Sequence, residues 1–484
     1  MKKILLSVTL LSLLAAASAQ HRANGHRAKV HRATGLVVDD KIADKIPQKT
    51  RLLTRAYTTL PKSWSLRQYC PAIDNQGEYS TCVGWATGYA ARTIAEAARQ
   101  GWKGTDYITS EAFSPLFVYG NIKYEGTKNC NAGTNIENAM KLLKNTGVVK
   151  KRSFDALCVD YVKSSLRSQA AQYKIDDYFL LFGPNHTYEQ AVNVTKKALV
   201  ENCPVVIGFK VYQSFESPGF DCWGGPGGEH TGYHAMCVVG YDDNKYGGAF
   251  LLMNSWSTQW GNQGYAWVRY KDYSDYTHDA LELYLKPKST TTKTTTKTTK
   301  TTTTTVTKTK FSGNLSMKLS TGKTLRATLG ASNGLMRYRI TESLVSGTRY
   351  RIYLGNNQPC YVYVFSGDQQ NNVAVNFPYN SHVSPALTYS SNDIALPSEN
   401  TWLELDDTTG TDYLCVLFSK YSVDINSLLN YLQNSDGNFY DKVKSGFSKY
   451  LAPQNEINYN STTMSFTATT SGVVVPLIVE FSHK

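Results

Sequence analysis

The sequence predicts an α+β protein with two folded domains, and three observations indicate it. The 484-residue chain is 41% apolar and 12% aromatic, which is enough to build ordinary hydrophobic cores. Within residues 60–286, helical periodicity comes first and strand-like runs follow, an order typical of an α+β fold with two unlike lobes. A run of Thr and Lys at residues 287–310 then acts as an extended linker to a second domain at residues 311–484.

The first domain divides into a helical lobe and an antiparallel β lobe. Apolar residues recur at three- and four-residue spacing from Val83 to Ala97, which predicts a buried helix. Later runs rich in Val, Tyr, Phe and Trp lie between Gly and Asn clusters, which predicts strands. These runs are Pro204–Val211, His234–Tyr241, Ala249–Trp256 and Gly264–Tyr270.

The second domain has the pattern of a mainly-β, sandwich-like fold. Cys360–Phe365 is a strong strand, and turn residues recur at roughly ten-residue spacing after it. A helical patch near Ile425–Leu432 interrupts the strands. The further strand-like runs are Phe377–Pro378, Ile394–Pro397, Trp402–Leu405, Tyr413–Ser419 and Thr463–Ser482.

The N-terminus predicts an exported protein. Lys2 and Lys3 precede the apolar run Ile4–Ala16, and small residues follow, so residues 1–19 have the pattern of a signal peptide, with Gln20 first in the mature chain. The apolar run is too short to span a bilayer, and no second long apolar stretch follows. We expect a soluble periplasmic or extracellular protein without a transmembrane segment. Residues 20–59 are basic and predicted to be largely disordered.

The net charge of +13 is concentrated in the tails. Residues 21–67 hold eleven Lys and Arg against three Asp, and residues 286–310 hold seven Lys and no acid, so the rest of the chain is slightly acidic. A basic groove for nucleic acid is therefore not expected. Acidic cell-surface polymers remain a secondary partner class for the basic tails or the C-terminal domain.

Nine cysteines in an exported chain allow four disulfides and leave one thiol over. Eight cysteines can pair in 105 ways, so the sequence does not fix the connectivity. The odd number agrees with one cysteine being kept free for chemistry.

Cys82 is the candidate nucleophile. The loop Asp74–Thr81 delivers it to the first turn of the predicted helix, where unpaired amides and the helix dipole favour thiolate over thiol. The amide of Cys82 and the side chain of Gln76, six residues earlier, can then donate to an oxyanion. The competing interpretation is a buried cysteine at a helix start with an unrelated glutamine.

The candidate base is His234, at the start of a strand. If this strand pairs with the run from Ala249 as an antiparallel hairpin, Tyr241 lies opposite Ala249 and His234 falls near Trp256. Period two places Asn254 on the same face as Trp256. Simple pairing thus brings together a base, an orienting carboxamide and a shielding indole, as a Cys–His nucleophile needs.

These motifs together resemble the papain-like cysteine peptidases. The resemblance rests on Gln76-Gly77-x4-Cys82, Tyr233-His234-Ala235, Cys130-Asn131-Ala132-Gly133 and the long segment Asn254-Ser255-Trp256-x3-Trp260-Gly261-x2-Gly264-Tyr265, and it covers about residues 60–286. It implies a two-lobe catalytic domain that hydrolyses proteins or peptides without cofactor or metal. It also implies a thiolate–imidazolium pair of Cys82 and His234, oriented by Asn254 under Trp256, an oxyanion donor at Gln76, and substrate binding through the backbone of Gly133.

The sequence departs from the family's pattern in three places. Tyr79 stands where the family has a cysteine bonded to the Cys of Cys-Asn-Gly-Gly, so Cys130 needs another partner, for which Cys158 is a candidate, or has none. Val83 replaces a tryptophan, which alters packing. The segment before residue 60 lacks the family's large helical inhibitory propeptide, which puts control by a folded pro-domain in doubt.

The C-terminal domain is similar to an uncharacterised accessory domain of bacterial signalling and peptidase proteins. No ligand follows from that likeness. Cys360 and Cys415 both lie on predicted strands, and a disulfide or two buried thiols are equally compatible with the pattern.

Two other functions fit parts of the sequence. An acyl transferase or amidase acting on cell-wall peptides would keep the chemistry and change the acceptor. A non-catalytic binding or adhesion protein would use the β domain and basic tails, but it has no need for Cys82, His234, Asn254 and Gln76 together.

Overall fold

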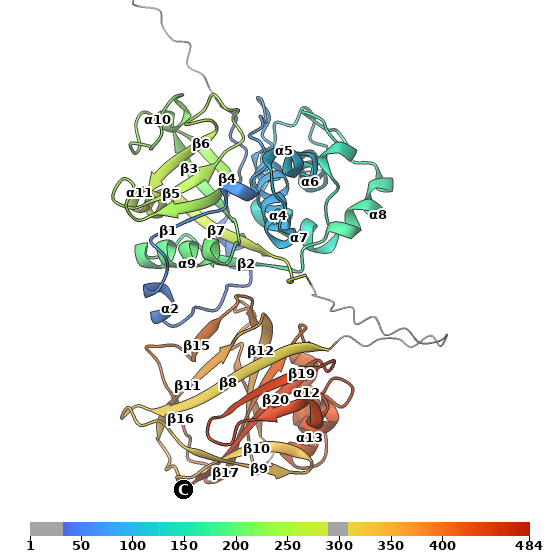
Figure 1. The fold of residues 1–484 in the computed structure, drawn as a ribbon, viewed down its shortest axis with the longest axis vertical. Coiled ribbons are helices and arrows are strands. Elements are labelled where there is room, and N and C mark those ends of the chain that lie inside the picture. The colour runs from blue at the N-terminus through green and yellow to red at the C-terminus, as the bar shows by residue number, and fades with distance from the viewer. Residues whose placement is uncertain (1–31, 125, 289–307, 371) are drawn as a thin grey trace, which may run out of the picture. The chain divides into compact units, whose positions relative to one another are not determined.

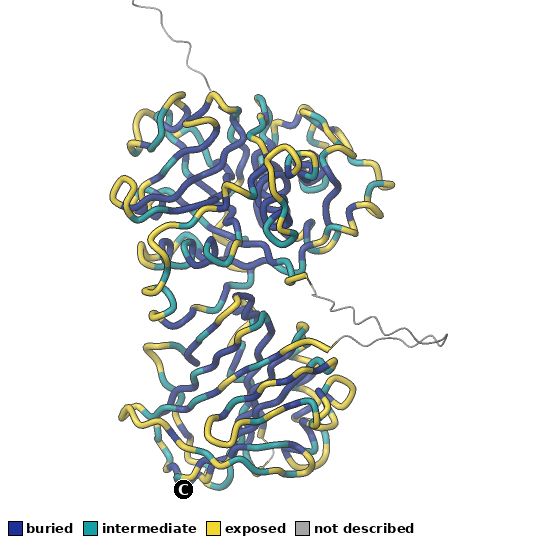
Figure 2. Tube along the Cα trace, viewed as in Figure 1, coloured by how far each residue is buried: buried dark blue, intermediate teal, exposed yellow. Residues whose placement is uncertain are grey.

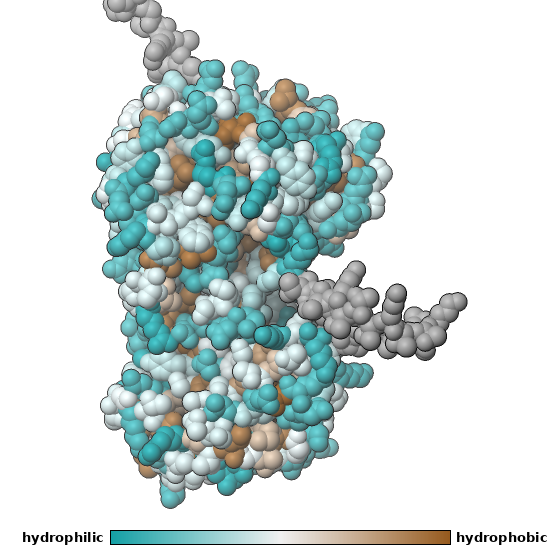
Figure 3. All heavy atoms as spheres, in the orientation of Figure 1, coloured by the Kyte–Doolittle hydropathy of each residue, from teal (hydrophilic) through white to brown (hydrophobic). Residues whose placement is uncertain are grey.

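The computed structural model describes residues 32–124, 126–288, 308–370 and 372–484 (Figure 1). The expected signal peptide at residues 1–19, the basic residues up to 31 and most of the Thr/Lys linker lie outside these ranges. Within them, no helix is both long and apolar enough to cross a membrane. In the face shown in Figure 3, hydrophilic side chains cover most of the surface and hydrophobic ones lie in small groups.

A helical lobe carries the candidate nucleophile, as predicted. The helical run that begins at Cys82 continues without a break to Gln100, and its first half is buried (Figure 2). Close packing requires Gly84, because a Cβ there would lie 2.2 Å from the carbonyl oxygen of Pro115. The helices of this lobe include α3 (Cys82–Gly84), the wider turns of η2 (Trp85–Arg92), α4 (Thr93–Gln100), α5 (Thr105–Ser110), α6 (Pro115–Ile122), α7 (Ile136–Asn145) and α8 (Arg167–Ala170).

The β lobe is one antiparallel sheet in the order β2-β7-β3-β4-β5-β6, with the short β1 paired to β4. The four predicted runs correspond to β3 to β6, whereas β2 and β7 were not predicted, since β7 is interrupted by Asp and Glu. Helices α9 (Tyr188–Val200) and α11 (Tyr270–Tyr276) belong to the same lobe. The strands are β1 (Ser63–Ser65), β2 (Asp177–Phe182), β3 (Val205–Tyr212), β4 (His230–Asp242), β5 (Ala249–Met253), β6 (Tyr265–Arg269) and β7 (Thr277–Tyr284).

The described part of the segment before the peptidase-like domain, residues 32–59, makes backbone hydrogen bonds to the folded domain. Residues 33–38 hydrogen-bond to both lobes, and the backbone of Lys49 pairs with Leu180 of β2. Two single-turn helices lie in this segment, α1 (Asp40–Ala43) and α2 (Arg55–Thr58). Composition suggests disorder because this segment has no core of its own, but backbone hydrogen bonds to the folded domain supply its order.

The C-terminal domain is a β sandwich, with two sheets enclosing an apolar core. One sheet runs β13-β12-β17-β20-β10-β9 with β14 on β12, and the other runs β15-β11-β8-β19-β18 with β16 on β11. Apolar residues from both sheets, such as Ile352 and Val416, meet between them. The helical patch is α12 (Ile425–Asn434), and a second helix, α13 (Phe439–Gly446), was not predicted.

The strands of this domain begin soon after the linker. They are β8 (Thr309–Leu319), β9 (Ala327–Ser332), β10 (Leu335–Ile340), β11 (Arg349–Asn356), β12 (Cys360–Asp368), β13 (Val373–Phe377), β14 (Ala386–Leu387), β15 (Asn392–Leu396), β16 (Leu403–Glu404), β17 (Gly410–Ser419), β18 (Ile457–Tyr459), β19 (Ser465–Thr470) and β20 (Val474–His483).

One disulfide joins Cys130 to Cys158, the candidate partner named from the sequence. The other seven cysteines of the described chain are free thiols, so the four disulfides that the count allows do not form. Cys360 and Cys415 lie on the paired strands β12 and β17, but Cys415 is opposite Phe365. Five residues of strand, about 16 Å, therefore separate the two thiols, too far for a disulfide.

Candidate active site

Cys82 lies at the start of α3, at the junction of the two lobes, and its side chain is fully buried. Thr81 precedes it as an N-cap that makes no side-chain cap hydrogen bond. The thiol is near the backbone of Ala235, the residue after His234, and the backbone of Gly35 from the N-terminal segment. The nucleophile candidate of the helical lobe thus meets the strand that carries the candidate base.

The predicted hairpin holds the histidine and the asparagine together. His234 Nε2 lies 2.7 Å from Asn254 Oδ1, and the imidazole stacks on the Trp256 ring with centroids 4.3 Å apart. At the turn end of the hairpin, the register of β4 and β5 differs by one residue from the prediction. A bulge places Tyr241 opposite Phe250 instead of Ala249. His234 Nδ1 has no hydrogen-bond partner among the described residues. The imidazole is therefore fixed through one nitrogen, and the other is left to act on a proton.

Gln76 is buried beside this group and fixed by Ser255, in the segment that follows β5. Its Oε1 accepts a 2.7 Å hydrogen bond from Ser255 Oγ, and its backbone N–H donates to the Ser255 carbonyl. Its Nε2 donates to the carbonyl oxygens of Tyr79, at 2.8 Å, and Ala33, at 3.1 Å. The amide expected to donate to an oxyanion thus already donates to a peptide carbonyl.

Residues 33–38 run between the lobes through this site, and we call them the cleft strap. On one side, the Val37 N–H donates to the Thr134 carbonyl at 2.8 Å, and the Thr134 N–H donates to the Gly35 carbonyl at 2.9 Å. On the other side, the Leu36 N–H donates to the Tyr233 carbonyl at 3.1 Å. Sequence reasoning missed the strap, because its contacts are made by backbone groups that leave no pattern in the residue types.

The strap also contacts residues adjacent to the candidate nucleophile and base. Trp256 Nε1 donates to the Ala33 carbonyl, and Ser80 Oγ donates to the Thr34 carbonyl. Gly35 is required for this fit, since a Cβ there would lie 2.4 Å from the Ser80 carbonyl oxygen. The strap therefore fills the space in front of Cys82.

Gly133 was expected to bind an extended chain through its backbone. In the structure the two hydrogen bonds to the strap come from Thr134, one residue later. Gly133 contributes space, because a Cβ on it would lie 2.9 Å from the Gly35 carbonyl oxygen. A substrate-binding role for Gly133 stays a prediction.

With the strap in place, the electrostatics favour the uncharged forms of both candidate groups. Burial raises the pKa of Cys82 to about 11, although nearby backbone groups of Ala235 and Gly35 lower it. Burial likewise lowers the pKa of His234 to about 4, against the opposing hydrogen bond to Asn254. The helix start alone predicts a thiolate, but removal of water from both groups outweighs it in this closed form.

No group of three or more His, Cys, Asp or Glu that could hold a metal ion occurs in the part of the chain that the structure describes. The side chains around Cys82 are an imidazole, two carboxamides and an indole, which suits nucleophilic chemistry at sulfur.

Comparison with protein families matches residues 60–284 to the papain family cysteine proteases. This part of the chain belongs to that family. The papain-family domain is accordingly a cysteine-type peptidase, a class of hydrolase whose substrates are proteins or peptides. Residues 343–421 match a domain of unknown function, DUF4384, within the C-terminal sandwich.

Individual relatives agree with the family assignment. An uncharacterised peptidase C1-like protein of Acanthamoeba polyphaga mimivirus is 27% identical over 46% of this chain and 69% of its own length. Cathepsin B-like cysteine proteinase 2 of Haemonchus contortus is 32% identical over 16% of this chain and 22% of its own length. Peptidase 1 of Dermatophagoides farinae is 26% identical over 42% of this chain and 59% of its own length. The chain therefore spans less than two thirds of the last two relatives.

Among solved structures, xylellain, a cysteine protease from Xylella fastidiosa, is similar to this chain at 22% identity and a TM-score of 0.43. The similarity covers 52% of this chain and 96% of xylellain.

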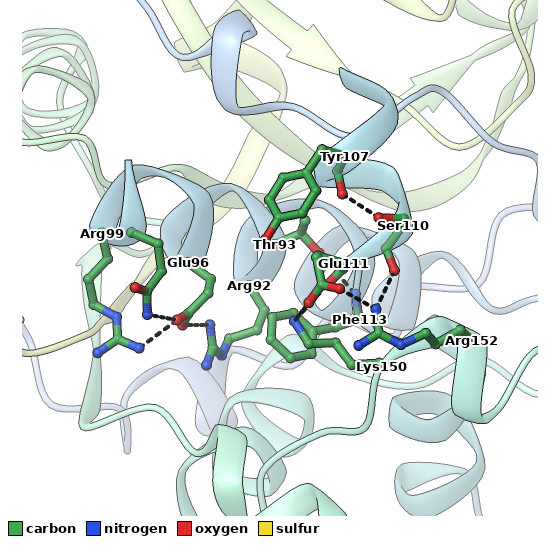
Figure 4. Close-up of polar contacts among 11 residues, drawn as sticks. Arg92, Thr93, Glu96, Arg99, Tyr107, Ser110, Glu111, Phe113, Lys150 and Arg152 are labelled. Atoms are coloured by element: carbon green, nitrogen blue, oxygen red, sulfur yellow. Dashed lines mark hydrogen bonds and ion pairs between the residues drawn. The ribbon is translucent and has the colours of Figure 1, made fainter. Parts of the chain in front are cut away.

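A buried ion cluster anchors the helix that begins at Cys82 (Figure 4). The Arg92 guanidinium is 1% exposed and donates to Glu96 Oε2 at 2.7 Å, and Arg99 and Gln100 donate to the other oxygen. Arg92 also stacks over the Phe113 ring. Burial would raise the pKa of Glu96, but Arg92 and the hydrogen bonds lower it to about 2. The Glu96 carboxylate therefore balances the positive charge of the Arg92 guanidinium, which has almost no contact with water.

Replacing Glu96 with glutamine should destabilise this domain by about 3 kcal/mol, because the buried Arg92 charge loses its partner. Urea unfolding followed by intrinsic fluorescence measures this loss. Because the folded pKa lies below the ordinary value of 4.5, the Glu96 contribution is complete above pH 4.5 and declines as pH falls toward 2. The Glu96→Gln variant should show less acid sensitivity than the parent between those values. If both chains lose stability equally between pH 4.5 and pH 2, Glu96 is not a source of the acid sensitivity.

Proposed function

We propose that the protein is an exported cysteine endopeptidase that cleaves peptide bonds through Cys82, His234 and Asn254. One observation carries the proposal: the imidazole of His234 is held by Asn254 and leaves Nδ1 without a hydrogen-bond partner among the described residues, while the backbone of the next residue, Ala235, contacts the buried Cys82 thiol. A nucleophile needs a base on one side and an orienting group on the other, and this geometry supplies both.

The proposed reaction proceeds in two stages. His234 takes the Cys82 proton, and the sulfur forms a bond to the substrate carbonyl carbon. The C–N bond then breaks as His234 returns the proton to the leaving amine, which leaves a thioester on Cys82. In the second stage His234 takes a proton from water, the oxygen attacks the thioester carbon, and the C–S bond breaks to release the acid and the thiol.

Gln76 and the Cys82 amide are the proposed oxyanion donors. The hydrogen bond from Gln76 Nε2 to the Ala33 carbonyl supports this role, because an amide in this position is already directed at a carbonyl oxygen. Ser255 and the Tyr79 carbonyl fix its orientation. Such a donor is typically worth on the order of 10² to 10³ in turnover.

We further propose that the cleft strap holds the full chain inactive. A backbone group of Gly35 lowers the pKa of Cys82, as an amide N–H does by stabilising a thiolate. The strap thus presents a hydrogen-bond donor to the Cys82 sulfur instead of an electrophilic carbonyl carbon. The sulfur is therefore not positioned to attack the strap. Release of the strap would readmit water and favour the ionised forms of both Cys82 and His234.

Export is proposed on the sequence of residues 1–19, and the final location is the periplasm or the medium. The acyl-transfer and binding-only alternatives have no observation in the structure that favours them over hydrolysis.

A product assay tests the proposed function. A chain whose strap is displaced should cut casein into peptides with new internal termini, read by mass spectrometry, and should lose this activity on thiol alkylation. If casein stays intact and cell-wall peptides are consumed instead, the endopeptidase proposal is wrong and the acyl-transfer alternative takes its place.

A further inference from the structure

A small cavity lies between the helix that begins at Cys82 and the hairpin that carries His234 and Asn254. Its volume is about 10 Å³, which is room for one water molecule. The helix lines it with Trp85 and neighbouring residues, and the hairpin lines it with Asn254 and the residues beside it. The cavity therefore borders both of the elements that hold the proposed catalytic residues.

The side-chain amide of Asn254 leaves its nitrogen without a partner. Its oxygen Oδ1 accepts a hydrogen bond from the Ser255 N–H at 2.7 Å and lies 2.7 Å from His234 Nε2. The Ser255 N–H fixes this orientation of the amide, because the reversed orientation would bring two donors together. Nδ2 is then buried with no hydrogen-bond partner among the described residues. A buried amide N–H without an acceptor is costly, so this group calls for one.

A second buried donor lines the same cavity. Trp85 follows Cys82 by three residues, so both lie on one side of the helix. The indole Nε1 of Trp85 is buried and, like Asn254 Nδ2, has no hydrogen-bond partner among the described residues. The Tyr89 ring packs edge-on against this indole, with centroids 5.0 Å apart, which limits its rotation. Two donors without acceptors thus border a space the size of one water molecule.

The cavity is also lined by an acceptor. Asp74 borders it, and the carboxylate of this residue lies 3.3 Å from Lys151 Nζ and is otherwise partly open to solvent. A water that accepts from Trp85 and Asn254 and donates to Asp74 makes three hydrogen bonds, the usual number for a buried water.

We propose that a single buried water bridges Trp85 Nε1 and Asn254 Nδ2, and that Trp85 acts through this water as a positioning residue for the reaction. The proposal rests on the proposed peptidase function. The water holds the nitrogen end of the amide while Ser255 holds the oxygen end, so Oδ1 stays directed at His234 Nε2. An acceptor at Nε2 requires the imidazole proton on that nitrogen, and Nδ1 then keeps the lone pair that a base needs.

The alternative is a dry cavity, in which Trp85 only fills space. The amide would then be held at its oxygen end alone, and the indole N–H would have no effect on the chemistry. The Trp85→Phe variant separates the two, because it keeps an aromatic ring beside Tyr89 and removes the N–H.

Nuclear magnetic resonance of the full chain, labelled with nitrogen-15 in tryptophan and histidine, tests the bridge without turnover. We expect the Trp85 Nε1–H to show a cross-peak to a long-lived water, assigned by its loss in Trp85→Phe. The His234 nitrogen shifts should show one tautomer, protonated at Nε2, in the parent and a mixture of tautomers in Trp85→Phe. A missing water cross-peak, or the same tautomer in both chains, would overturn the proposal.

Kinetics of a strap-displaced chain give the second readout. Trp85→Phe should lower kcat on casein on the order of tenfold with KM unchanged, because the imidazole is misdirected while the contacts to substrate remain. Trp64→Phe is the matched control, since Trp64 Nε1 is also buried without a partner among the described residues but Trp64 does not line the cavity. Its kcat should stay within about twofold of the parent. Equal kcat values in the two variants would count against the bridge.

The two readouts separate this proposal from the proposed function. If the water cross-peak and the tautomer change are present but casein stays intact, the bridge stands and the peptidase proposal fails. If casein is cleaved and Trp85→Phe changes neither kcat nor the His234 tautomer, the positioning role of Trp85 is overturned and the peptidase proposal stands.

Discussion

Replacing Cys82 with alanine should lower casein cleavage by a strap-displaced chain on the order of 10⁵- to 10⁶-fold, to the background of the assay. The sulfur forms the bond that the whole reaction depends on, and no other nucleophile is proposed to take its place. The side chain is fully buried and small, so alanine leaves the fold nearly unchanged. Initial rates of peptide release, measured with circular dichroism as a check on folding, give the comparison.

Cys70→Ala is the matched control, because Cys70 is also a buried free thiol of the papain-family domain. Its sulfur contacts the Leu66 carbonyl and is not part of the proposed site. We expect this variant to keep its turnover within about twofold. Normal cleavage by the Cys82→Ala chain would remove Cys82 from the mechanism.

Displacing the cleft strap should raise the alkylation rate of Cys82 by about 10- to 100-fold. Gly35→Leu does this by a clash, because the new Cβ would lie 2.4 Å from the Ser80 carbonyl oxygen. Overpacking of this kind costs about 1 to 3 kcal/mol, and each 1.4 kcal/mol shifts the closed-to-open equilibrium tenfold. The rest of the N-terminal segment, including the pairing of Lys49 with Leu180, stays in place. Casein cleavage should rise in parallel.

Gly224→Leu controls for the substitution itself, since a Cβ at Gly224 meets no atom within 4 Å. That chain should match the parent in both alkylation and cleavage. If Gly35→Leu behaves like Gly224→Leu, the strap does not limit access to Cys82.

The contact between the candidate residues His234 and Asn254 could be predicted from sequence because strands β4 and β5 bring them together. His234 and Asn254 come together through hairpin pairing, which needs only the period of the strand and an approximate register. The distal register was one residue off because the sequence carries no sign of the bulge near Val239. Cys82 was placed by helical periodicity, which continues to Gln100 without interruption.

The parts that sequence did not predict depend on contacts between distant backbone groups. Residues 33–38 look disordered by composition, yet hydrogen bonds to Thr134 and Tyr233 hold them between the lobes. Burial also reverses the expected ionisation of the two candidate residues, because it raises the pKa of Cys82 to about 11 and lowers the pKa of His234 to about 4. Strand β7 was missed because Asp279 and Glu282 interrupt its apolar run, and β2 because its continuous apolar residues show no alternation.

The central claim is that Cys82 is a nucleophile activated by His234. It is tested most directly by treatment with a thiol-directed epoxide, followed by intact-mass measurement and peptide mapping. The described residues of the chain include seven free thiols, five of them buried, and Cys82 is the one proposed to act with a base that a carboxamide orients. We predict a single adduct, located on the peptide that contains Cys82, whose formation slows at least tenfold in a His234→Ala chain. An adduct on any other cysteine, or labelling of Cys82 that does not depend on His234, would contradict the account.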